Sequence, residues 1–142
     1  DGIINYSEWS IPLGRRFRAL KIWFLIRAYG LEGLRTMVRN HIGWSRKLHQ
    51  KLAATPDFEI ITPPMWSLFT FRYVPAGTKD ADTLNIALVN ASNDDGRIYL
   101  TQTRVDGALA IRFQCGQAEM EERDVDMAYD VITEIAAALP PG

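Results

Sequence analysis

The residues best suited to chemistry lie near the amino end of the chain, in Pro12-Leu13-Gly14. Ser10 can cap a helix there, and Pro12 suits a first turn, where an N–H group has no intrahelical partner. Free N–H groups at the start of a helix attract anions, and glycine has no Cβ to hold a ligand away from the backbone. The pattern favours an anion site at residues 12–14. The alternative is that Gly14 only permits tight packing of the helix.

The remaining polar side chains form no familiar catalytic constellation. His41 and His49 are the two histidines, and their spacing of eight residues on one expected helix is too wide for an i, i+4 metal pair. Cys115 is the single cysteine, which excludes an internal disulfide and predicts a small buried side chain. No serine has a Gly-x-Ser-x-Gly context. We therefore expect neither a catalytic residue nor a metal site within this chain.

Charge is distributed unevenly along the sequence. Residues 1–53 hold ten Lys/Arg and three Asp/Glu, a net +7, whereas residues 54–142 hold six and fourteen, a net −8. A basic half can bind nucleic acid, but these cations alternate with the apolar run Trp23-Phe-Leu-Ile26, which a folded chain buries. Arg15, Arg16 and Arg18 could clamp a phosphate or carboxylate. Their spread over different helix faces instead favours contacts with a neighbouring domain or subunit. We expect no nucleic-acid partner.

Length and composition predict an ordinary globular fold. The chain has 142 residues, of which 47% are hydrophobic and 23% charged, enough for one domain with a sizeable core. It contains no run of 18 apolar residues and no basic segment leading into an apolar core and cleavage site. We expect no membrane partner and a cytoplasmic location.

Two helices must position residues 12–14. The first is expected over residues 13–29 and ends at Gly30, which suits a C′ position. Its middle, Leu20 to Ile26, is apolar on nearly every face apart from Lys21, which predicts burial on several sides. An amphipathic helix follows and ends at Thr55-Pro56, so the two form a corner across Gly30.

The pattern after residue 55 changes to that of a small α+β domain. We expect a short strand at 58–61, broken by Thr62-Pro-Pro64, and another at 67–74. A helix is expected at 81–93, capped by Asp80 or Asp82, with an apolar stripe of Leu84, Ala87, Leu88 and Ala91. Strands at 98–104 and 108–113 should follow, joined by a turn at Asp106-Gly107. The last expected helix has a buried stripe of Val125, Ala128, Ile132, Ile135 and Leu139. The predicted fold is two layers, a small, mostly antiparallel sheet covered by helices. Residues 1–54 provide a lead-in and two helices, and residues 55–142 the α+β small domain.

A family resemblance is carried by the run Ile11-Pro-Leu-Gly-Arg-Arg-Phe-Arg-Ala-Leu-Lys-Ile-Trp-Phe24, with Tyr29-Gly30, Gly33-Leu-Arg35 and Arg39-Asn-His41. The run resembles the C-terminal part of the group II pyridoxal-phosphate-dependent amino acid decarboxylases. Within that group it is most similar to the aromatic-L-amino-acid branch, the dopa, tyrosine and tryptophan decarboxylases. The resemblance continues through Phe58-Glu59, Phe71-Arg72 and residues 101–113, and so covers nearly the whole chain.

The resemblance implies a fold, a cofactor and partners. The fold would be the C-terminal small domain of the fold-type I pyridoxal-phosphate enzymes. The cofactor would be held by a lysine outside this chain, in the N-terminal remainder of the enzyme, since no lysine here has the right context. In such homodimers the segment matching Pro12, Leu13 and Gly14 reaches the partner subunit's site near the cofactor phosphate. Leu13 and Gly14 would border a small aromatic amino acid substrate, with glycine leaving room for a large ring.

Some features leave the reaction open. Gln102 stands where many aromatic decarboxylases have a histidine between two threonines. Arg112 resembles the arginine that holds the substrate carboxylate in fold-type I aminotransferases, but a decarboxylase must release that group, so this role is not expected here. The family's catalytic loop tyrosine should lie just upstream of Asp1; with phenylalanine in its place, related enzymes are oxygen-consuming aldehyde synthases. The start at Asp1-Gly2 without methionine suggests a fragment, expected to be inactive alone. A different class of function is a stand-alone helical module whose basic half docks an acidic partner.

Overall fold

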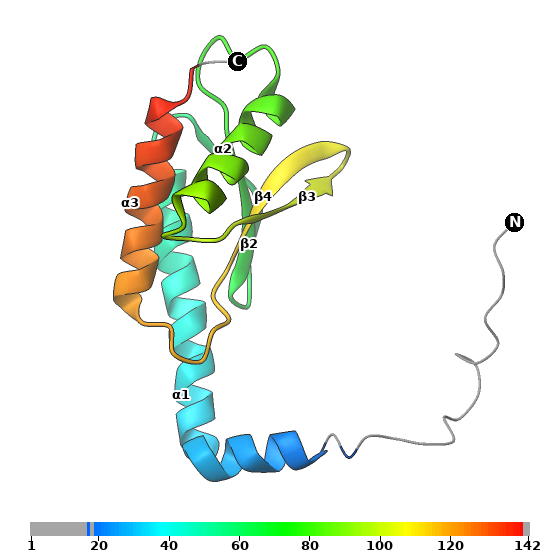
Figure 1. Cartoon of the computed structure of the whole chain (residues 1–142), viewed down its shortest axis with the longest axis vertical. Helices are drawn as coiled ribbons and strands as arrows, with labels where there is room; N and C mark the ends of the chain where they lie inside the picture. The colour runs from blue at the N-terminus through cyan, green and yellow to red at the C-terminus, as the bar shows by residue number, and fades with distance from the viewer. Residues whose placement is uncertain (1–16, 18, 141–142) are drawn as a thin grey trace, which may run out of the picture. The chain divides into compact units, whose positions relative to one another are not determined.

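The computed structural model describes residue 17 and residues 19–140. Figure 1 shows the order of elements along the chain. The chain divides into two units, residues 1–36 and residues 37–142, with the boundary inside the first helix. The elements are α1 (Ala19–Ala53), β1 (Phe58–Met65), β2 (Leu68–Tyr73), α2 (Ala81–Asp95), β3 (Thr101–Val105), β4 (Ala108–Gln114) and α3 (Glu122–Ala138).

The corner predicted at Gly30 is confirmed. Two helical segments of α1 meet there, and Gly30 has φ 67° and ψ 165°. This region of backbone space is essentially restricted to glycine. A Cβ added at Gly30 would meet no atom within 4 Å, so the conformation rather than the space requires glycine.

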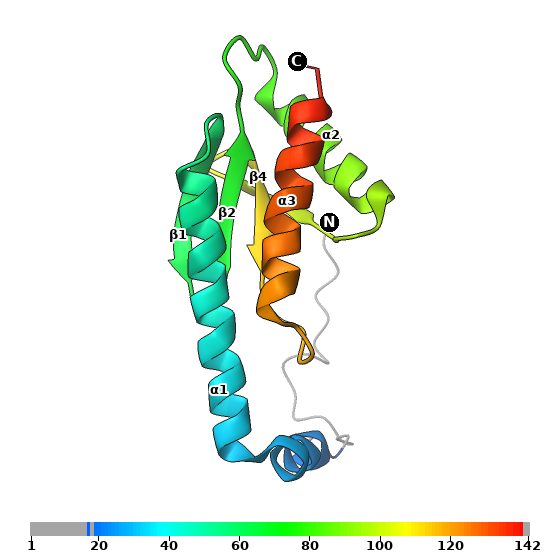
Figure 2. The same ribbon diagram turned by 90° about the vertical axis from the view of Figure 1, so that its left-hand side faces the viewer.

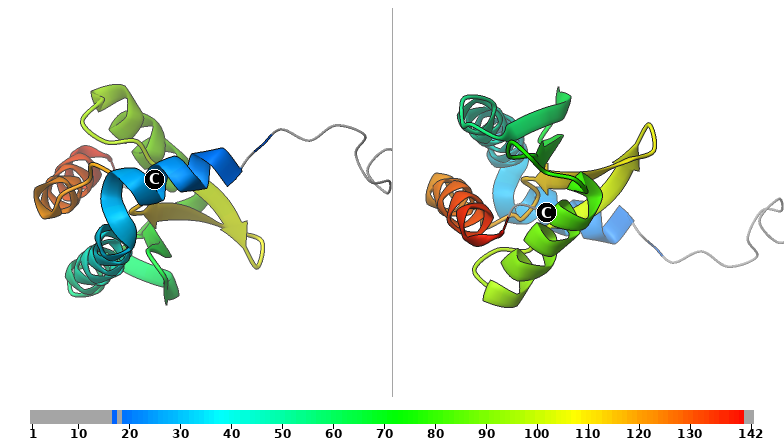
Figure 3. Two further views of the ribbon diagram at one scale, coloured as in Figure 1. Left: turned by 90° about the horizontal axis from the view of Figure 1, so that it is seen from below. Right: turned by 90° about the horizontal axis from the view of Figure 1, so that it is seen from above.

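The second unit has the predicted α+β architecture. Its sheet has four strands in the order β1-β2-β4-β3, and every neighbouring pair is antiparallel. Helices α2 and α3 and the part of α1 after residue 36 cover one face of this sheet, as the two layers in Figure 2 and the end-on views in Figure 3 show. The fold is that of a small antiparallel sheet covered by helices.

The core lies between the sheet and the helices. Strands β2 and β4 contribute Phe69, Phe71 and Ile111, which are fully buried, and Phe113, which is 6% exposed. Cys115 follows β4 and is buried, as predicted, and burial raises the pKa of its thiol to about 11. The helices contribute Leu48, Leu52, Leu88, Val89, Val125, Ala128, Ile132 and Ala136.

The two hairpins differ in how well they were predicted. Asp106 and Gly107 both have positive φ, 50° and 84°, which is the backbone of the predicted tight turn between β3 and β4. The predicted break at Thr62-Pro-Pro64 is wrong, because β1 continues to Met65. Register shifts on either side of Thr62 accommodate the prolines, and β1 is an edge strand, where a missing N–H costs little.

Helix α2 is bounded as the sequence indicates, but its buried face is turned. Of the two candidate caps, Asp80 is the one used, accepting a hydrogen bond from the Thr83 N–H at 3.0 Å, and Gly96 ends the helix in the left-handed conformation. The expected stripe is partly wrong, because Ala87 and Ala91 are only half-buried. The buried residues are Leu84, Asn85, Leu88, Val89 and Ser92.

Two asparagine side chains explain why α2 buries a different face from the one expected. The Asn85 amide accepts from the Tyr73 N–H at 2.8 Å and donates to the Tyr73 carbonyl at 2.8 Å. Asn93 repeats the arrangement with the Leu100 N–H at 2.7 Å and the Leu100 carbonyl at 3.0 Å. Each amide satisfies both backbone groups of one residue, and Asn85 is fully buried. These bonds hold α2 against the end of β2 and the approach to β3.

Asp82 ties the same helix to the strands. Its carboxylate accepts from Arg72 and Arg104, each at 2.9 Å, and from the Leu109 N–H at 3.2 Å. The Leu109 hydrogen bond, followed by the Arg104 interaction, holds the pKa of Asp82 below its usual range. One residue of α2 thereby contacts β2, β3 and β4.

Helix α3 begins with a capping box between Glu121 and Asp124. Its predicted stripe is confirmed for Val125, Ala128 and Ile132, and Ile135 and Leu139 pack against the core from half-buried positions. Ion pairs join this helix to α1: Lys47 contacts Glu122 at 2.7 Å and Asp126 at 2.9 Å, and Lys51 contacts Asp126 at 2.7 Å. Part of the basic half thus pairs with acidic surface of this same chain.

We predict that Asn85→Ala lowers the free energy of unfolding by about 1–3 kcal/mol, because the Tyr73 backbone groups lose their buried partners. Urea denaturation followed by circular dichroism measures the change. The matched control is Asn90→Ala, an exposed asparagine of the same helix, expected to change stability by less than about 0.5 kcal/mol. Equal losses in the two variants would contradict the role given to Asn85.

A second prediction concerns acid stability and Asp82. Because its folded-state pKa is lowered, Asp82 stabilises the protein above its unfolded-state pKa, and this contribution disappears as pH falls through the folded-state value. Asp82→Asn should therefore be less stable at pH 7 and lose less stability on acidification than the wild type. Denaturant midpoints from pH 7 down to about 2 measure this. Asp94→Asn, an exposed carboxylate of α2, should retain the wild-type slope, and a parallel slope for Asp82→Asn would refute the assignment.

Candidate functional site

The predicted site residues Pro12, Leu13 and Gly14 lie outside the described residues, as do Arg15, Arg16 and Arg18. The structure describes the surface that follows them in the chain, at Phe17 and in the first part of α1. That surface belongs to the first unit, residues 1–36.

This part of α1 exposes large apolar side chains. Phe17 is 76% exposed, Ile22 61% and Trp23 53%. Within the described residues the expected burial on several sides is therefore not met, because no described element of the first unit covers them. Phe17, Ala19, Leu20, Ile22, Trp23 and Ile26 line a hollow of about 570 Å³ with almost no polar groups. So much apolar surface on a short segment is typical of a surface that another protein segment covers.

One cation of this segment, Arg27, lies beside an aromatic ring. The Arg27 guanidinium is 5.7 Å from the centre of the Trp23 ring, and Trp23 meets Phe24 edge to face with ring centres 5.1 Å apart. Arg35 pairs with Glu32. Arginine stacked on tryptophan keeps its charge at the rim of the apolar surface, an arrangement common in protein interfaces.

Two lysines of the second unit are unsuited to covalent chemistry with a carbonyl group. Lys47 and Lys51 are held in ion pairs with α3, and the hydrogen bonds from Glu122 and Asp126 raise the pKa of Lys47. A nucleophilic lysine needs its pKa lowered so that the neutral amine is populated. These contacts leave neither Lys47 nor Lys51 as a candidate for the cofactor lysine.

Both histidines serve packing. His41 is 6% exposed and its ring lies 5.7 Å from that of Trp44, and His49 meets Phe69 edge to face at 5.6 Å. The apolar residues of this helix recur at three- and four-residue steps that include Val38 and Ile42 but not His41, so the burial of His41 was missed. Among the described residues, no group of three or more His, Cys, Asp or Glu side chains could hold a metal ion.

Arg112 and Gln102 lie on the sheet, in β4 and β3. Arg112 is half-buried and lies between Thr70 of β2 and Thr101 of β3 in the strand register. Gln102 is exposed on the edge strand β3. Neither is brought next to a described catalytic group.

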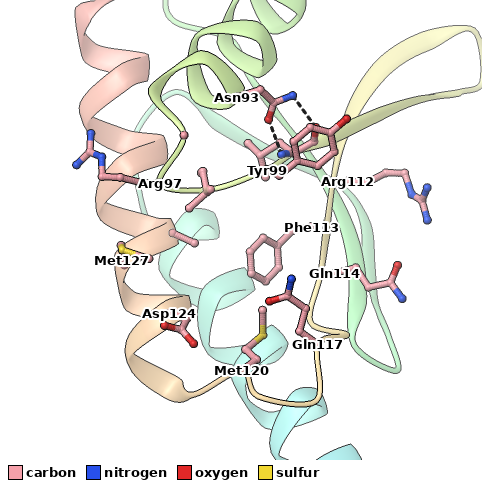
Figure 4. Close-up of a pocket in the computed structure, with 14 residues that line it drawn as sticks. Asn93, Arg97, Tyr99, Arg112, Phe113, Gln114, Gln117, Met120, Asp124 and Met127 are labelled. Atoms are coloured by element: carbon pink, nitrogen blue, oxygen red, sulfur yellow. Dashed lines mark hydrogen bonds between the residues drawn. The ribbon is translucent and has the colours of Figure 1, made fainter.

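A second hollow, which the sequence did not predict, lies within the second unit. It has a volume of about 630 Å³ and is lined by the end of α2, the segment after it, β4, and the first turns of α3 (Figure 4). Its lining comes from three separate stretches, residues 93–100, 112–120 and 124–128, so no local pattern marks it. Over the residues that the structure describes, no helix is long and apolar enough to cross a membrane.

Several plant enzymes have similar sequences. The chain is 37% identical over 139 residues to phenylacetaldehyde synthase of Arabidopsis thaliana and to tryptophan decarboxylase 2 of Oryza sativa, in each case over 96% of this chain. It is 35% identical over its whole length to tyrosine decarboxylase 2 of Narcissus pseudonarcissus. The chain spans only 28–29% of the length of these relatives.

Solved structures agree with the sequence relatives. Catharanthus roseus tryptophan decarboxylase in complex with L-tryptophan matches 94% of this chain with a TM-score of 0.81 and 30% identity, which is 29% of that chain. Rhodiola rosea 4-hydroxyphenylacetaldehyde synthase matches 96% of this chain, and 30% of its own, with a TM-score of 0.80 and 31% identity. The family model for the pyridoxal-dependent decarboxylase conserved domain matches residues 1–74. The chain therefore belongs to the pyridoxal-dependent decarboxylase family.

Proposed function

We propose that the whole protein is a pyridoxal-phosphate-dependent decarboxylase that converts an aromatic L-amino acid to its amine and carbon dioxide. The observation that carries this proposal is the similarity over 96% of the chain to a tryptophan decarboxylase, with tyrosine decarboxylases beside it. Membership of an enzyme family favours this function over a stand-alone helical module. The cofactor lysine is expected outside these 142 residues, so the isolated chain should be inactive.

Residues 12–14 are the proposed contribution of this chain to the active site. Pyridoxal phosphate, when bound, supplies an electron sink for the electron pair left when carbon dioxide departs. Pro12, Leu13 and Gly14 would lie near its phosphate, where free N–H groups at a helix start favour an anion. Leu13 and Gly14 would border the substrate ring in the partner subunit's site. The absence of a Cβ at Gly14 leaves room for that ring.

The proposed partners are the N-terminal remainder of the enzyme and a second subunit. The apolar side chains exposed between Phe17 and Tyr29 support this, because obligate interfaces bury surfaces of this composition. A two-fold homodimer would place two composite sites at one interface. We also propose a cytoplasmic location, which suits a chain whose one cysteine is an unpaired buried thiol.

The second candidate function is an oxygen-dependent aromatic aldehyde synthase. It is favoured by the similarity to two such enzymes, phenylacetaldehyde synthase and 4-hydroxyphenylacetaldehyde synthase. The residue expected to decide between them is the loop tyrosine, or a phenylalanine in its place, just upstream of Asp1.

The reaction is tested by incubating the whole protein and pyridoxal phosphate with tryptophan, tyrosine, dopa or phenylalanine. We expect release of carbon dioxide with the matching amine and no oxygen uptake. Aldehyde with oxygen uptake would establish the second candidate. No carbon dioxide from any of the four substrates would reject both.

Substrate choice at residue 14 gives a further prediction. Gly14→Ser should weaken transition-state binding of the large aromatic substrates by about 1–3 kcal/mol and so lower kcat/KM for them, because the added group crowds the pocket. Steady-state kinetics with tryptophan, tyrosine and phenylalanine measure this. Gly43→Ser is the matched control: an added Cβ at Gly43 meets no atom within 4 Å, so kcat/KM should stay unchanged. Unchanged values for Gly14→Ser would leave Gly14 a packing role only.

The shared site is tested by mixing inactive subunits. One subunit lacks the cofactor lysine and the other carries Gly14→Trp, and each alone should be inactive. Equal mixing followed by subunit exchange should restore about a quarter of the wild-type activity, because half the dimers are mixed and each has one complete site. If mixed dimers form, as mass spectrometry can show, and activity does not return, Gly14 does not serve the neighbouring site.

A further inference from the structure

The hollow of the second unit has the size of a small-molecule site. Its volume of about 630 Å³ falls in the range of roughly 300–1,000 Å³ that is typical of ligand pockets. It lies entirely within residues 93–128, so its walls belong to one unit of the chain.

The floor of the hollow suits a flat apolar group. The Phe113 ring and the Met120 thioether turn into the same space, and Met127 lines it from α3 (Figure 4). Thioether sulfur makes favourable contacts with aromatic rings, and methionine adapts its shape to the group it packs on. Tyr99 lines the hollow with a ring that is 79% exposed, so an aromatic surface is available there for stacking.

The charged side chains that line the hollow do not all point into it. Arg97, Arg112 and Asp124 are its charged residues, and both guanidinium groups point away from the space in Figure 4. Arg97 is in addition neutralised by Asp95 at 2.6 Å and Glu134 at 3.0 Å.

Asp124 is the charged group left to meet a ligand. It is half-buried, and one of its oxygens accepts the Glu121 N–H at 2.8 Å. None of the ion pairs within the described residues involves it. Asp124 shares a helix face with Met127 at i, i+3, so its carboxylate borders the apolar floor. The Gln117 amide, which also turns inward, adds a hydrogen-bonding group.

We propose that this hollow binds a protonated aromatic amine, with the ring against Phe113, Met120 and Met127 and the ammonium group at Asp124. An aromatic amino acid fits less well, because its own carboxylate would lie close to Asp124 and be repelled. A neutral aromatic alcohol loses the ion pair. A protonated aromatic amine is also the product of the proposed reaction. That identification of the ligand rests on the proposed function, whereas the binding itself does not.

The test compares tryptamine with tryptophol, the neutral alcohol of the same shape, by titration calorimetry on the whole protein. We expect the wild type to bind tryptamine about tenfold or more tightly than tryptophol at a site where Asp124→Asn abolishes the difference. Asparagine still accepts the Glu121 N–H, so the capping box is retained. Asp130→Asn, an exposed carboxylate of the same helix, is the matched control and should bind as wild type.

Met127→Lys gives an independent check. Met127 is 39% exposed, so a lysine is tolerated there, and its ammonium group three residues from Asp124 should compete with the ligand and weaken tryptamine binding about tenfold. Binding is measured without turnover, so its outcome does not depend on whether the protein catalyses decarboxylation. Tryptamine affinity that is unchanged in both variants overturns the proposal. The absence of any Asp124-dependent binding, as when another part of the whole protein fills the hollow, also overturns it.

Discussion

The pairing of β2 with β4 is the interaction on which the second unit depends. Phe69 lies opposite Phe113 and Phe71 opposite Ile111, so four large apolar side chains leave the same face of the sheet in one block. Three helical segments pack on that block and bury it. A slip of one residue in this register would turn all four side chains toward the other face. The aromatic contact between the two strands, Phe69 with Phe113 at 5.6 Å between ring centres, adds specificity to the register.

The polar contacts of α2 complete what the apolar block begins. A helix on a sheet can rotate or slide by small amounts at little apolar cost, whereas an amide paired with both groups of one backbone residue cannot. Asn85 and Asn93 make that contact at two points, eight residues apart, and Asp82 adds a charged one. The position of α2 in turn shapes the hollow beside it, because residues 93–100 form one of its walls.

Features set by a few neighbouring residues were predictable from the sequence. The corner at Gly30, the turn at Asp106-Gly107 and the cap at Asp80 all follow from local backbone and side-chain chemistry. The course of β1 through its prolines was not, because its place at the sheet edge depends on the other strands. The buried face of α2 depends likewise on partners that are distant in sequence. The hollow could not be predicted for the same reason, because three separate stretches of the chain form it. The expected site at residues 12–14, in contrast, came from a local run of unusual composition.

The corner at Gly30 also has a consequence for chirality. With φ 67° and ψ 165°, and no atom within 4 Å of an added Cβ, the position excludes L-residues through their own backbone clashes alone. Those clashes are reversed for a residue of opposite hand. D-alanine placed at Gly30 by chemical ligation would fit the native backbone, and it would narrow the unfolded ensemble that glycine leaves broad. The backbone at Gly30 therefore suits a D-residue in a chain of L-amino acids, and glycine is the one genetically encoded residue that is achiral.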